Sequence, residues 1–211
     1  VEGVLLPKRR YLLFEVARTL STGKFLKTIF LGLLYEVGLL TLQSTLKRIF
    51  KILRGLSITE LLEQFRKMPI MPSVKEVLET LNRKGCKTAL ISSGLPAILV
   101  EDLAKRLGAD HAFGIEAQVT DDHLTGDIKG DVIEAKGKAL ILKKLLENKD
   151  LQSYNCIIVA DDRNNLPMFP LSTLKIGYNP DFILRVKSNF VVSGDLAEIL
   201  PIIENPKHHP K

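Results

Sequence analysis

The stretch Ile157-Ile158-Val159-Ala160-Asp161-Asp162-Arg163-Asn164-Asn165 decides the fold. Four apolar residues, three of them β-branched, predict a short strand that is buried on both faces. The acids and amides directly after it predict a loop at the strand's carboxyl end. Thr88-Ala89-Leu90-Ile91, followed by Ser92-Ser93-Gly94, repeats this arrangement earlier in the chain. Buried strands that alternate with helices are typical of a parallel sheet, so the sequence predicts an α/β fold.

Working outward from these two strands, the sequence predicts a parallel sheet with helices on both faces. Ser73 and Glu76 have the spacing of a capping box, in which a serine and a glutamate satisfy free amides at a helix start. The other predicted elements are a helix from Pro96 to Leu107 closed by Gly108, a hairpin over Gln118–Asp127, a helix over Ala135–Leu146, the strands Cys156–Ala160, Leu174–Gly177 and Phe190–Val192, and a last helix from Asp195. The tail 205–211 is predicted to be disordered.

The first third of the chain has a different pattern. From Tyr11 to Lys67 apolar residues recur at helical spacing, and Ser57 with Glu60 predicts a helix start. Met68-Pro69-Ile70-Met71-Pro72 cannot continue a helix, because proline lacks an amide hydrogen and restricts the residue before it. We therefore predict a domain boundary in this segment.

Composition excludes several classes of protein. The 211 residues are 26% charged and 45% hydrophobic, which excludes a disordered chain and a collagen-like repeat. The two cysteines, Cys86 and Cys156, are too few for a disulfide scaffold and predict reduced thiols in a cytoplasmic protein. The most apolar stretch, Phe25–Leu42, contains Lys27 and Glu36, so no membrane anchor is predicted.

The basic charge is confined to one region. The whole chain has 30 lysines and arginines and 24 acidic residues. Residues 1–73 contain twelve basic and five acidic residues, whereas residues 74–211 contain eighteen and nineteen. The basic region has no tryptophan and no aromatic-rich platform for single strands. We therefore predict no nucleic-acid partner and no membrane partner.

Polar residues that follow the predicted strands point to phosphate chemistry. Ligands of open parallel sheets bind beyond the carboxyl ends of the strands, where Ser92-Ser93-Gly94 and Asp161-Asp162 are expected. Lys136 lies at the start of a predicted helix between them. Hydroxyl and amide groups donate to phosphate oxygens, lysine neutralises their charge, and carboxylates hold Mg²⁺. Each of these segments alone is more often an ordinary turn or surface residue, so the prediction depends on their combination.

In order and spacing, these motifs resemble the haloacid dehalogenase-like phosphatases, and among them the phosphoserine phosphatase-like branch. The resemblance rests on Ile91–Gly94, on Leu124–Ile128 through Ala135-Lys136-Gly137, and on Val159–Met168. It implies a Rossmann-like core, formed by residues 1–9 and 72–211, with a small helical cap inserted at 10–71.

The resemblance also implies a mechanism. In this family the first aspartate of an Asp-x-Asp motif attacks phosphorus and the second is a general acid and base. Val1-Glu2-Gly3-Val4-Leu5 matches the residues after that nucleophile, so Glu2 takes the second acidic position and the nucleophile is expected just before Val1. Either the given sequence lacks its N-terminal strand, which we favour because the sheet needs a central strand, or the protein lacks the nucleophile.

Site roles follow by resemblance, residue by residue. Ser92 is expected to bind the phosphoryl oxygens, with Ser93, Gly94 and Asn164 beside the phosphate, and Lys136 to separate its charge from that of the nucleophile. Mg²⁺ is expected at Asp161 and Glu2, the latter through its backbone carbonyl. Two residues depart from the family pattern: Asp162 replaces a glycine and adds a carboxylate near the metal, and Asn165 replaces an aspartate.

The expected substrate is a small phosphate ester other than phosphoserine. Arg9 stands where serine-specific relatives carry a glutamate for the substrate's amine, and Ile49, next to Lys47 and Arg48, stands at the position of the carboxylate-binding arginine. Arg9 and Arg48 suit a more anionic substrate, such as a sugar phosphate, a nucleotide or a phospholipid head group, although a solvated basic face explains them equally well.

The sequence is also compatible with two other functions. A non-catalytic binding or regulatory protein of the same fold would accommodate an absent nucleophile, Glu2 and Asn165. A basic cap that docks on an anionic membrane or nucleic acid is the weaker alternative. The sequence does not predict an oligomeric state.

Overall fold

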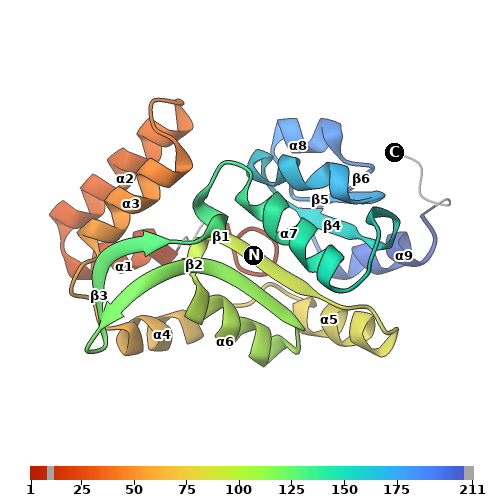
Figure 1. The fold of residues 1–211 in the computed structure, drawn as a ribbon, viewed down its shortest axis with the longest axis horizontal. Coiled ribbons are helices and arrows are strands. Elements are labelled where there is room, and N and C mark those ends of the chain that lie inside the picture. Colours follow the sequence, from red (N-terminus) through yellow and green to blue (C-terminus); the bar gives the residue numbers. More distant parts are fainter. Residues whose placement is uncertain (9–11, 207–211) are drawn as a thin grey trace.

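The computed structural model describes residues 1–8 and 12–206, and in it the strands form two three-stranded sheets (Figure 1). In the first sheet β1 (Ala89–Pro96) pairs in parallel with β2 (His111–Thr120), and β2 pairs antiparallel with β3 (His123–Lys129). In the second sheet β4 (Ile157–Ala160), β5 (Leu174–Tyr178) and β6 (Phe190–Val192) are all parallel. The predicted α/β class and the hairpin, which turns at Asp121–Asp122, are confirmed.

The helices lie on both faces of the sheets, as predicted (Figure 1). Helices α4, α5 and α6 lie along one side of the first sheet, and α7 lies on the other. The α-helices are α1 (Leu12–Leu20), α2 (Thr22–Glu36), α3 (Leu42–Ile52), α4 (Ile58–Arg66), α5 (Val74–Arg83), α6 (Ala97–Leu107), α7 (Gly137–Asn148), α8 (Phe182–Lys187) and α9 (Ile199–Glu204), and the 3-10 helices are η1 (Asp131–Ile133), η2 (Ser153–Asn155), η3 (Arg163–Leu171) and η4 (Leu196–Glu198). The predicted tail lies partly outside the described residues, since 207–211 are not described.

The N-terminal segment contacts the ends of both sheets. Amides of Val4 and Leu5 donate to the carbonyl of Val1, and Gly3 has a φ of 87°, so the segment forms a tight turn. Glu2 reaches Gly94 at the end of β1, and Gly3 lies against Asp161 after β4. The single continuous sheet expected from the sequence is thus divided, with Val1–Leu6 at the junction. An apolar strand upstream of Val1 remains our prediction for completing it.

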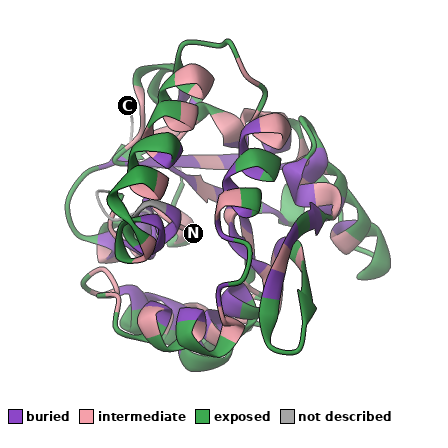
Figure 2. Cartoon of the chain, turned by 90° about the vertical axis from the view of Figure 1, so that its left-hand side faces the viewer, coloured by how far each residue is buried: buried purple, intermediate pink, exposed green. Residues whose placement is uncertain are grey.

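Apolar packing forms a large core cluster and a smaller one. In Figure 2 the exposed positions lie mainly on the outer sides of the helices, and the buried positions lie on their inner sides and along the strands. The large cluster joins Val4–Leu6, the inner faces of α1 and α3–α6, and the first sheet. The smaller one joins α7, β4, η3 and α8, and Ile91 packs against both. Burial of these side chains supplies the main force that fixes the elements around the N-terminal segment.

The helical region has clear N-caps. Ser21, Thr41 and Ser57 each accept a hydrogen bond from a backbone amide in the first turn of α2, α3 and α4. Ser57 accepts from the amide of Glu60 at 3.1 Å, which confirms the predicted helix start. Helix α4 ends at Arg66 and α5 begins at Val74, so the proline-rich segment interrupts the helices as predicted.

The division into core and cap remains a prediction. The β2–β3 hairpin pairs with β1 of the predicted core and also forms backbone hydrogen bonds with the predicted cap. The amide of Gly55 donates to the carbonyl of Leu124 at 2.8 Å, and the amide of Leu124 donates to the carbonyl of Leu56 at 2.9 Å. None of the helices in the described ranges is both long and apolar enough to cross a membrane.

The capping box predicted for Ser73 and Glu76 is wrong. Ser73 has a φ of 62°, a left-handed conformation, and its side chain makes no cap hydrogen bond. This backbone turns the hydroxyl away from the helix, where it donates to Asp195 Oδ2 at 3.0 Å. The serine therefore links α5 to the start of η4.

Candidate active site

The carboxyl end of β1 leaves the regular ladder at the predicted phosphate-binding residues. Pairing with β2 loses its register between Ile91 and Pro96, so Ser92, Ser93 and Gly94 turn toward the N-terminal segment. Both serines are buried, and the Gly94 amide donates to Ser92 Oγ at 3.2 Å. Ser93 Oγ has no hydrogen-bond partner among the described residues and lines a pocket. A buried hydroxyl without a partner is costly, so this one is available to a ligand.

Glu2 carries a carboxylate into this site. Its Oε1 accepts a hydrogen bond from the Leu12 amide at 3.0 Å, and its Oε2 lies so close to Gly94 that a Cβ there would clash. Burial raises the pKa of Glu2 to about 7, because it outweighs the hydrogen bond from the Leu12 amide, which lowers the pKa. A carboxyl group with this pKa exchanges protons near neutral pH.

Asp161 is the second buried carboxylate. It is 4% exposed, and its Oδ2 forms an ion pair with Lys8 Nζ at 3.1 Å. Gly3 lies directly against the carboxylate and has no room for a Cβ, so only glycine permits this approach. Burial, followed by the charge of Asp162, raises the pKa of Asp161.

The loop after β4 is held by its own polar side chains. Asp162 Oδ1 accepts from the amide of Asn164 at 3.0 Å and from Asn165 Nδ2 at 2.8 Å, which starts η3. Asn165 Oδ1 accepts from Lys138 Nζ at 2.9 Å. The aspartate in the glycine position thus rigidifies the loop, and the asparagine connects it to α7.

Two lysines approach the site from the start of α7. The predicted Lys136 is exposed and lines the pocket. Lys138, which was not predicted as a site residue, is the lysine that binds the loop after β4. Burial lowers the pKa of Lys138, although the negative charges of Asp162, Asp161 and Glu2 act to raise it. Lys138 therefore balances the buried carboxylates, and Lys136 remains free to face a ligand.

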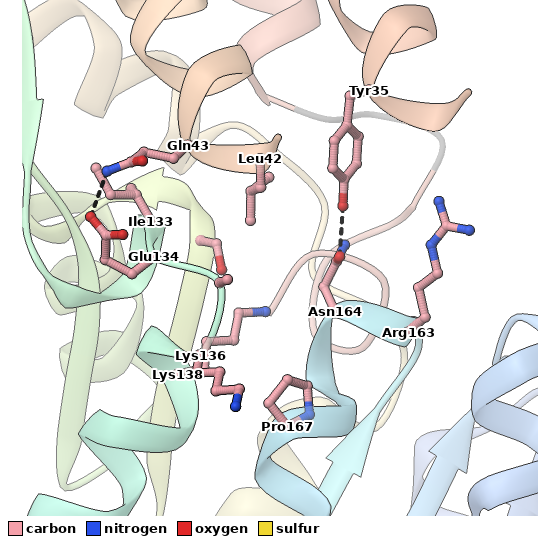
Figure 3. A pocket seen from close by; sticks show the side chains of 12 residues that line it. Tyr35, Leu42, Gln43, Ile133, Glu134, Lys136, Lys138, Arg163, Asn164 and Pro167 are labelled. Carbon is pink, nitrogen blue, oxygen red and sulfur yellow. Dashed lines mark hydrogen bonds between the residues drawn. The ribbon is translucent and has the colours of Figure 1, made fainter. Parts of the chain in front are cut away.

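A pocket of about 270 Å³ lies between the helical region and the sheets (Figure 3). In the figure Lys136 and Lys138 lie on one side and Asn164 and Arg163 on the other, with Tyr35 and Leu42 above them. The lining residues are Tyr35, Leu42, Gln43, Ser93, Ile133, Glu134, Ala135, Lys136, Lys138, Arg163, Asn164 and Pro167. Three cationic side chains against one acidic side chain favour an anionic ligand.

Polar bridges on two sides of the pocket connect the helical region to the rest of the molecule. The Tyr35 hydroxyl donates to Asn164 Oδ1 at 2.6 Å, and Arg163 lies 3.6 Å from Glu36 (Figure 3). Across the pocket, Gln43 Nε2 donates to Glu134 Oε1. The pocket is therefore closed by side chains from two regions far apart in sequence.

Most of the predicted site residues come together, but the substrate-selecting ones do not. Glu2, Ser92, Ser93, Gly94, Lys136, Asp161, Asp162 and Asn164 lie around the junction of the two sheets. Arg48 is exposed on α3 and is not among the lining residues, Ile49 is buried, and Arg9 lies outside the described residues. Tyr35 carried no sequence signal, whereas Arg163 lay inside a recognised motif without being given a role, and Lys138 directly followed another motif.

The donor set fits a magnesium ion. No group of three or more His, Cys, Asp or Glu side chains that could hold a metal occurs within residues 1–8 and 12–206. However, Mg²⁺ is usually held by one or two carboxylates together with phosphate oxygens and water. The buried Asp161 carboxylate and the neighbouring Glu2 provide such oxygen donors, and a bound cation would offset the cost of burying their charge.

Comparisons with known proteins agree on one family. A model of the family described as haloacid dehalogenase-like hydrolase matches residues 5–170. The phosphoserine phosphatase of Methanocaldococcus jannaschii is 29% identical over 168 residues, which cover 79% of this chain and 79% of that protein.

Solved structures give the same result. A phosphoserine phosphatase with an analogue of its phospho-aspartyl intermediate superposes with a TM-score of 0.79 at 27% identity, covering 90% of both chains. A substrate-bound phosphoserine phosphatase superposes with a TM-score of 0.80 at 27% identity and the same coverage.

Proposed function

Because the chain belongs to the haloacid dehalogenase-like hydrolase family, in its phosphoserine phosphatase-like branch, we propose that it hydrolyses a small phosphate monoester through a phosphoaspartate with the help of Mg²⁺. The single observation that carries this proposal is the buried Ser93 hydroxyl. It has no partner in the described chain and faces a pocket whose rim is cationic. Such a group is stabilised when a phosphoryl oxygen accepts its hydrogen bond.

In the proposed first step, the carboxylate of the residue preceding Val1 attacks phosphorus. The bond from phosphorus to the alcohol oxygen breaks, and protonated Glu2 gives its proton to the departing oxygen. In the second step, Glu2 takes a proton from water as that water attacks phosphorus and breaks the acyl-phosphate bond. Free carboxylate and inorganic phosphate result, so each atom and proton is accounted for.

The surroundings of Glu2 support its role as general acid and base. A pKa of about 7 leaves comparable amounts of both protonation states near neutral pH, as a group that gives and then retakes a proton requires. The Leu12 amide fixes the orientation of the carboxylate. Ser92, the Ser93 hydroxyl and the Gly94 amide are proposed to hold the phosphoryl oxygens, with Asn164 beside them and Lys136 neutralising their charge.

Asp161 and the backbone carbonyl of Glu2 are proposed to hold Mg²⁺, with Asp162 nearby. When bound, the ion supplies positive charge that offsets the phosphoryl oxygens and the attacking carboxylate. In this proposal Lys8, which pairs with Asp161, gives way to the ion.

The proposed substrate lacks the free amine of phosphoserine. The pocket has one acidic lining residue, Glu134, whose Oε1 already accepts a hydrogen bond from Gln43, against three cationic ones, so its lining favours anionic groups over an ammonium group. Arg163, Lys136 and Lys138 favour a substrate with further negative charge, such as a sugar phosphate or a nucleotide. This argument from the charges of the pocket uses neither Arg9 nor Arg48, whose roles in substrate binding stay predictions.

The Lys8–Asp161 ion pair favours a second candidate function. A lysine that occupies the metal-binding carboxylate would suit a non-catalytic protein that binds phosphate esters without hydrolysing them. The two functions differ in one residue outside the given sequence, namely the one that precedes Val1.

The test uses the full-length protein and a chromogenic aryl phosphate. We expect the residue before Val1 to be aspartate and turnover to require added Mg²⁺ and to stop with a chelator. A different residue at that position, or turnover that ignores the chelator, contradicts the hydrolase proposal in this form. In a panel of phosphate esters, phosphoserine should be a poor substrate, and a strong preference for it would overturn the substrate proposal alone.

A further inference from the structure

The outward face of α2 is apolar where a surface helix normally carries charge. Leu26, Phe30 and Leu33 of α2 and its C-cap residue Val37 are spaced by three or four residues, so they lie on one side of the helix, and they are 58–68% exposed. Leu39, in the loop that follows, is 72% exposed. We call these five residues the α2 stripe. Single exposed apolar side chains are ordinary, but a continuous row of this kind marks an interaction surface.

The stripe lies on α2 and on the residues that follow it, in the helical part of the molecule. Figure 1 shows α2 beside α3, opposite the end that holds α8 and β6. The inner side of α2 is occupied by Thr28, which is buried, and by Tyr35, which reaches the pocket. The helix therefore has one face that serves the site and another without a partner among the described residues.

Charge complementarity indicates what covers the stripe. Helices α1–α3 carry six basic residues, Arg18, Lys24, Lys27, Lys47, Arg48 and Lys51, and two acidic ones, Glu15 and Glu36. Two copies meeting through this region would bring like charges together, which is unfavourable. An anionic lipid surface instead attracts the basic side chains while its acyl region accepts the apolar ones.

We propose that α2 docks on an anionic lipid surface, lying in the plane of the interface with the α2 stripe inserted. Its fifteen residues span about 22 Å, less than the roughly 30 Å of a hydrocarbon core, so it lies on the bilayer. The sequence-based expectation of no membrane anchor followed from Lys27 and Glu36 within the apolar stretch. Those charges oppose a membrane span. In a helix that lies on the bilayer surface, however, the long side chains of Lys27 and Glu36 can reach water.

Vesicle sedimentation of the full-length protein tests this proposal. Wild type should pellet with phosphatidylcholine vesicles that contain roughly 30% phosphatidylserine and should stay in solution with phosphatidylcholine alone. The variant Leu26→Ser/Phe30→Ser/Leu33→Ser should bind at least about tenfold more weakly, because three inserted side chains are lost. Its thermal midpoint and its turnover of a soluble aryl phosphate should equal those of wild type, since none of these residues touches the pocket.

A matched control makes the same exchange on another exposed apolar helix. The variant Phe182→Ser/Ile183→Ser/Val186→Ser alters α8, whose three side chains are 45–79% exposed, and it should bind the vesicles as wild type does. The proposal is overturned if both variants lose vesicle binding equally, if the α2 variant binds as well as wild type, or if wild type does not bind. A wild-type dimer that the α2 variant converts to a monomer would also overturn it, by showing that a second copy covers the stripe.

Discussion

The helical region and the α/β region of this chain differ in charge, although burial holds both in place. Residues 1–73 carry twelve basic and five acidic side chains, a surplus of seven, whereas residues 74–211 carry eighteen and nineteen. The large core cluster joins α1, α3 and α4 to the first sheet, but the contacts that close the pocket are polar, from Tyr35 to Asn164 and from Gln43 to Glu134. Buried apolar contacts fix the geometry of the core, while these polar contacts can exchange with water.

This difference separates two tasks. The carboxylates and serines that would act on a phosphoryl group belong to the rigid junction of the sheets. Tyr35, Leu42 and Gln43, which line the pocket, and the α2 stripe belong to the helical region. Substitutions in the first should therefore abolish chemistry, and substitutions in the second should alter binding and selectivity. Four predictions test this contrast, from the largest expected effect to the smallest.

The largest effect is expected at Asp161. Asp161→Ala should reduce turnover of an aryl phosphate by about 1,000-fold or more, because the metal loses its main carboxylate. Steady-state kinetics with saturating Mg²⁺ would measure this. The control Glu101→Ala removes an exposed acid of α6 and should leave turnover unchanged. Turnover by Asp161→Ala within a few-fold of wild type would show that the metal assignment is wrong.

The partly buried Glu2 makes stability depend on pH. Its folded-state pKa of about 7 lies above the unfolded value of 4.5, so the folded state keeps a proton that the unfolded state releases. The free energy of unfolding of the metal-free protein should therefore fall as pH rises from below 4.5 through 7, by at most about 3 kcal/mol.

Glu2→Gln, which keeps an acceptor for the Leu12 amide, should reduce this pH dependence in urea titrations at several pH values. A smaller slope of the same sign should remain, because the pKa of Asp161 is raised as well. Identical pH profiles of wild type and Glu2→Gln would refute the raised pKa of Glu2.

The two lysines of α7 should separate chemistry from loop stability. Lys136→Met should lower kcat by about 100-fold with an unchanged thermal midpoint, because an exposed cation facing the phosphoryl group is lost. Lys138→Met should lower the free energy of unfolding by about 1–3 kcal/mol, because Asn165 and the buried carboxylates lose their cation. If Lys136→Met has full activity and Lys138→Met is stable but inactive, the two roles are reversed.

The smallest effect is expected at the polar bridge to the helical region. Tyr35→Phe removes one hydroxyl that donates to Asn164, which should cost about 1 kcal/mol and lower kcat/KM about fivefold, mainly through KM. Tyr154→Phe, at a tyrosine that is 71% exposed, is the matched control and should have no effect. A large drop in kcat for Tyr35→Phe would show that this tyrosine acts in the chemical step. It would then contradict the assignment of chemistry to the sheet junction and of binding to the helical region.

Much of the fold and part of the site could be predicted from the sequence. Strands, helices and the break at Met68–Pro72 follow from local patterns, and the family motifs brought Glu2, Ser93 and Asp161 into one site. Lys138 and Tyr35 could not be predicted as site residues, because a lysine in a first helical turn and a tyrosine on an apolar helix look the same whether they face solvent or a pocket. The failed capping box at Ser73 has a similar cause, since the Asp195 that binds its hydroxyl is 122 residues away.

The sequence by itself determined the α/β class, the family and the chemical character of the site. These depend on hydrophobic periodicity and on the order of polar residues after strands, both of which are properties of neighbouring residues. The tertiary structure alone decided which lysine faces the carboxylates, that Tyr35 closes the pocket, and that an apolar face of α2 is left exposed. These features depend on how segments distant in sequence pack together, and packing is decided by the shape and burial of the whole core.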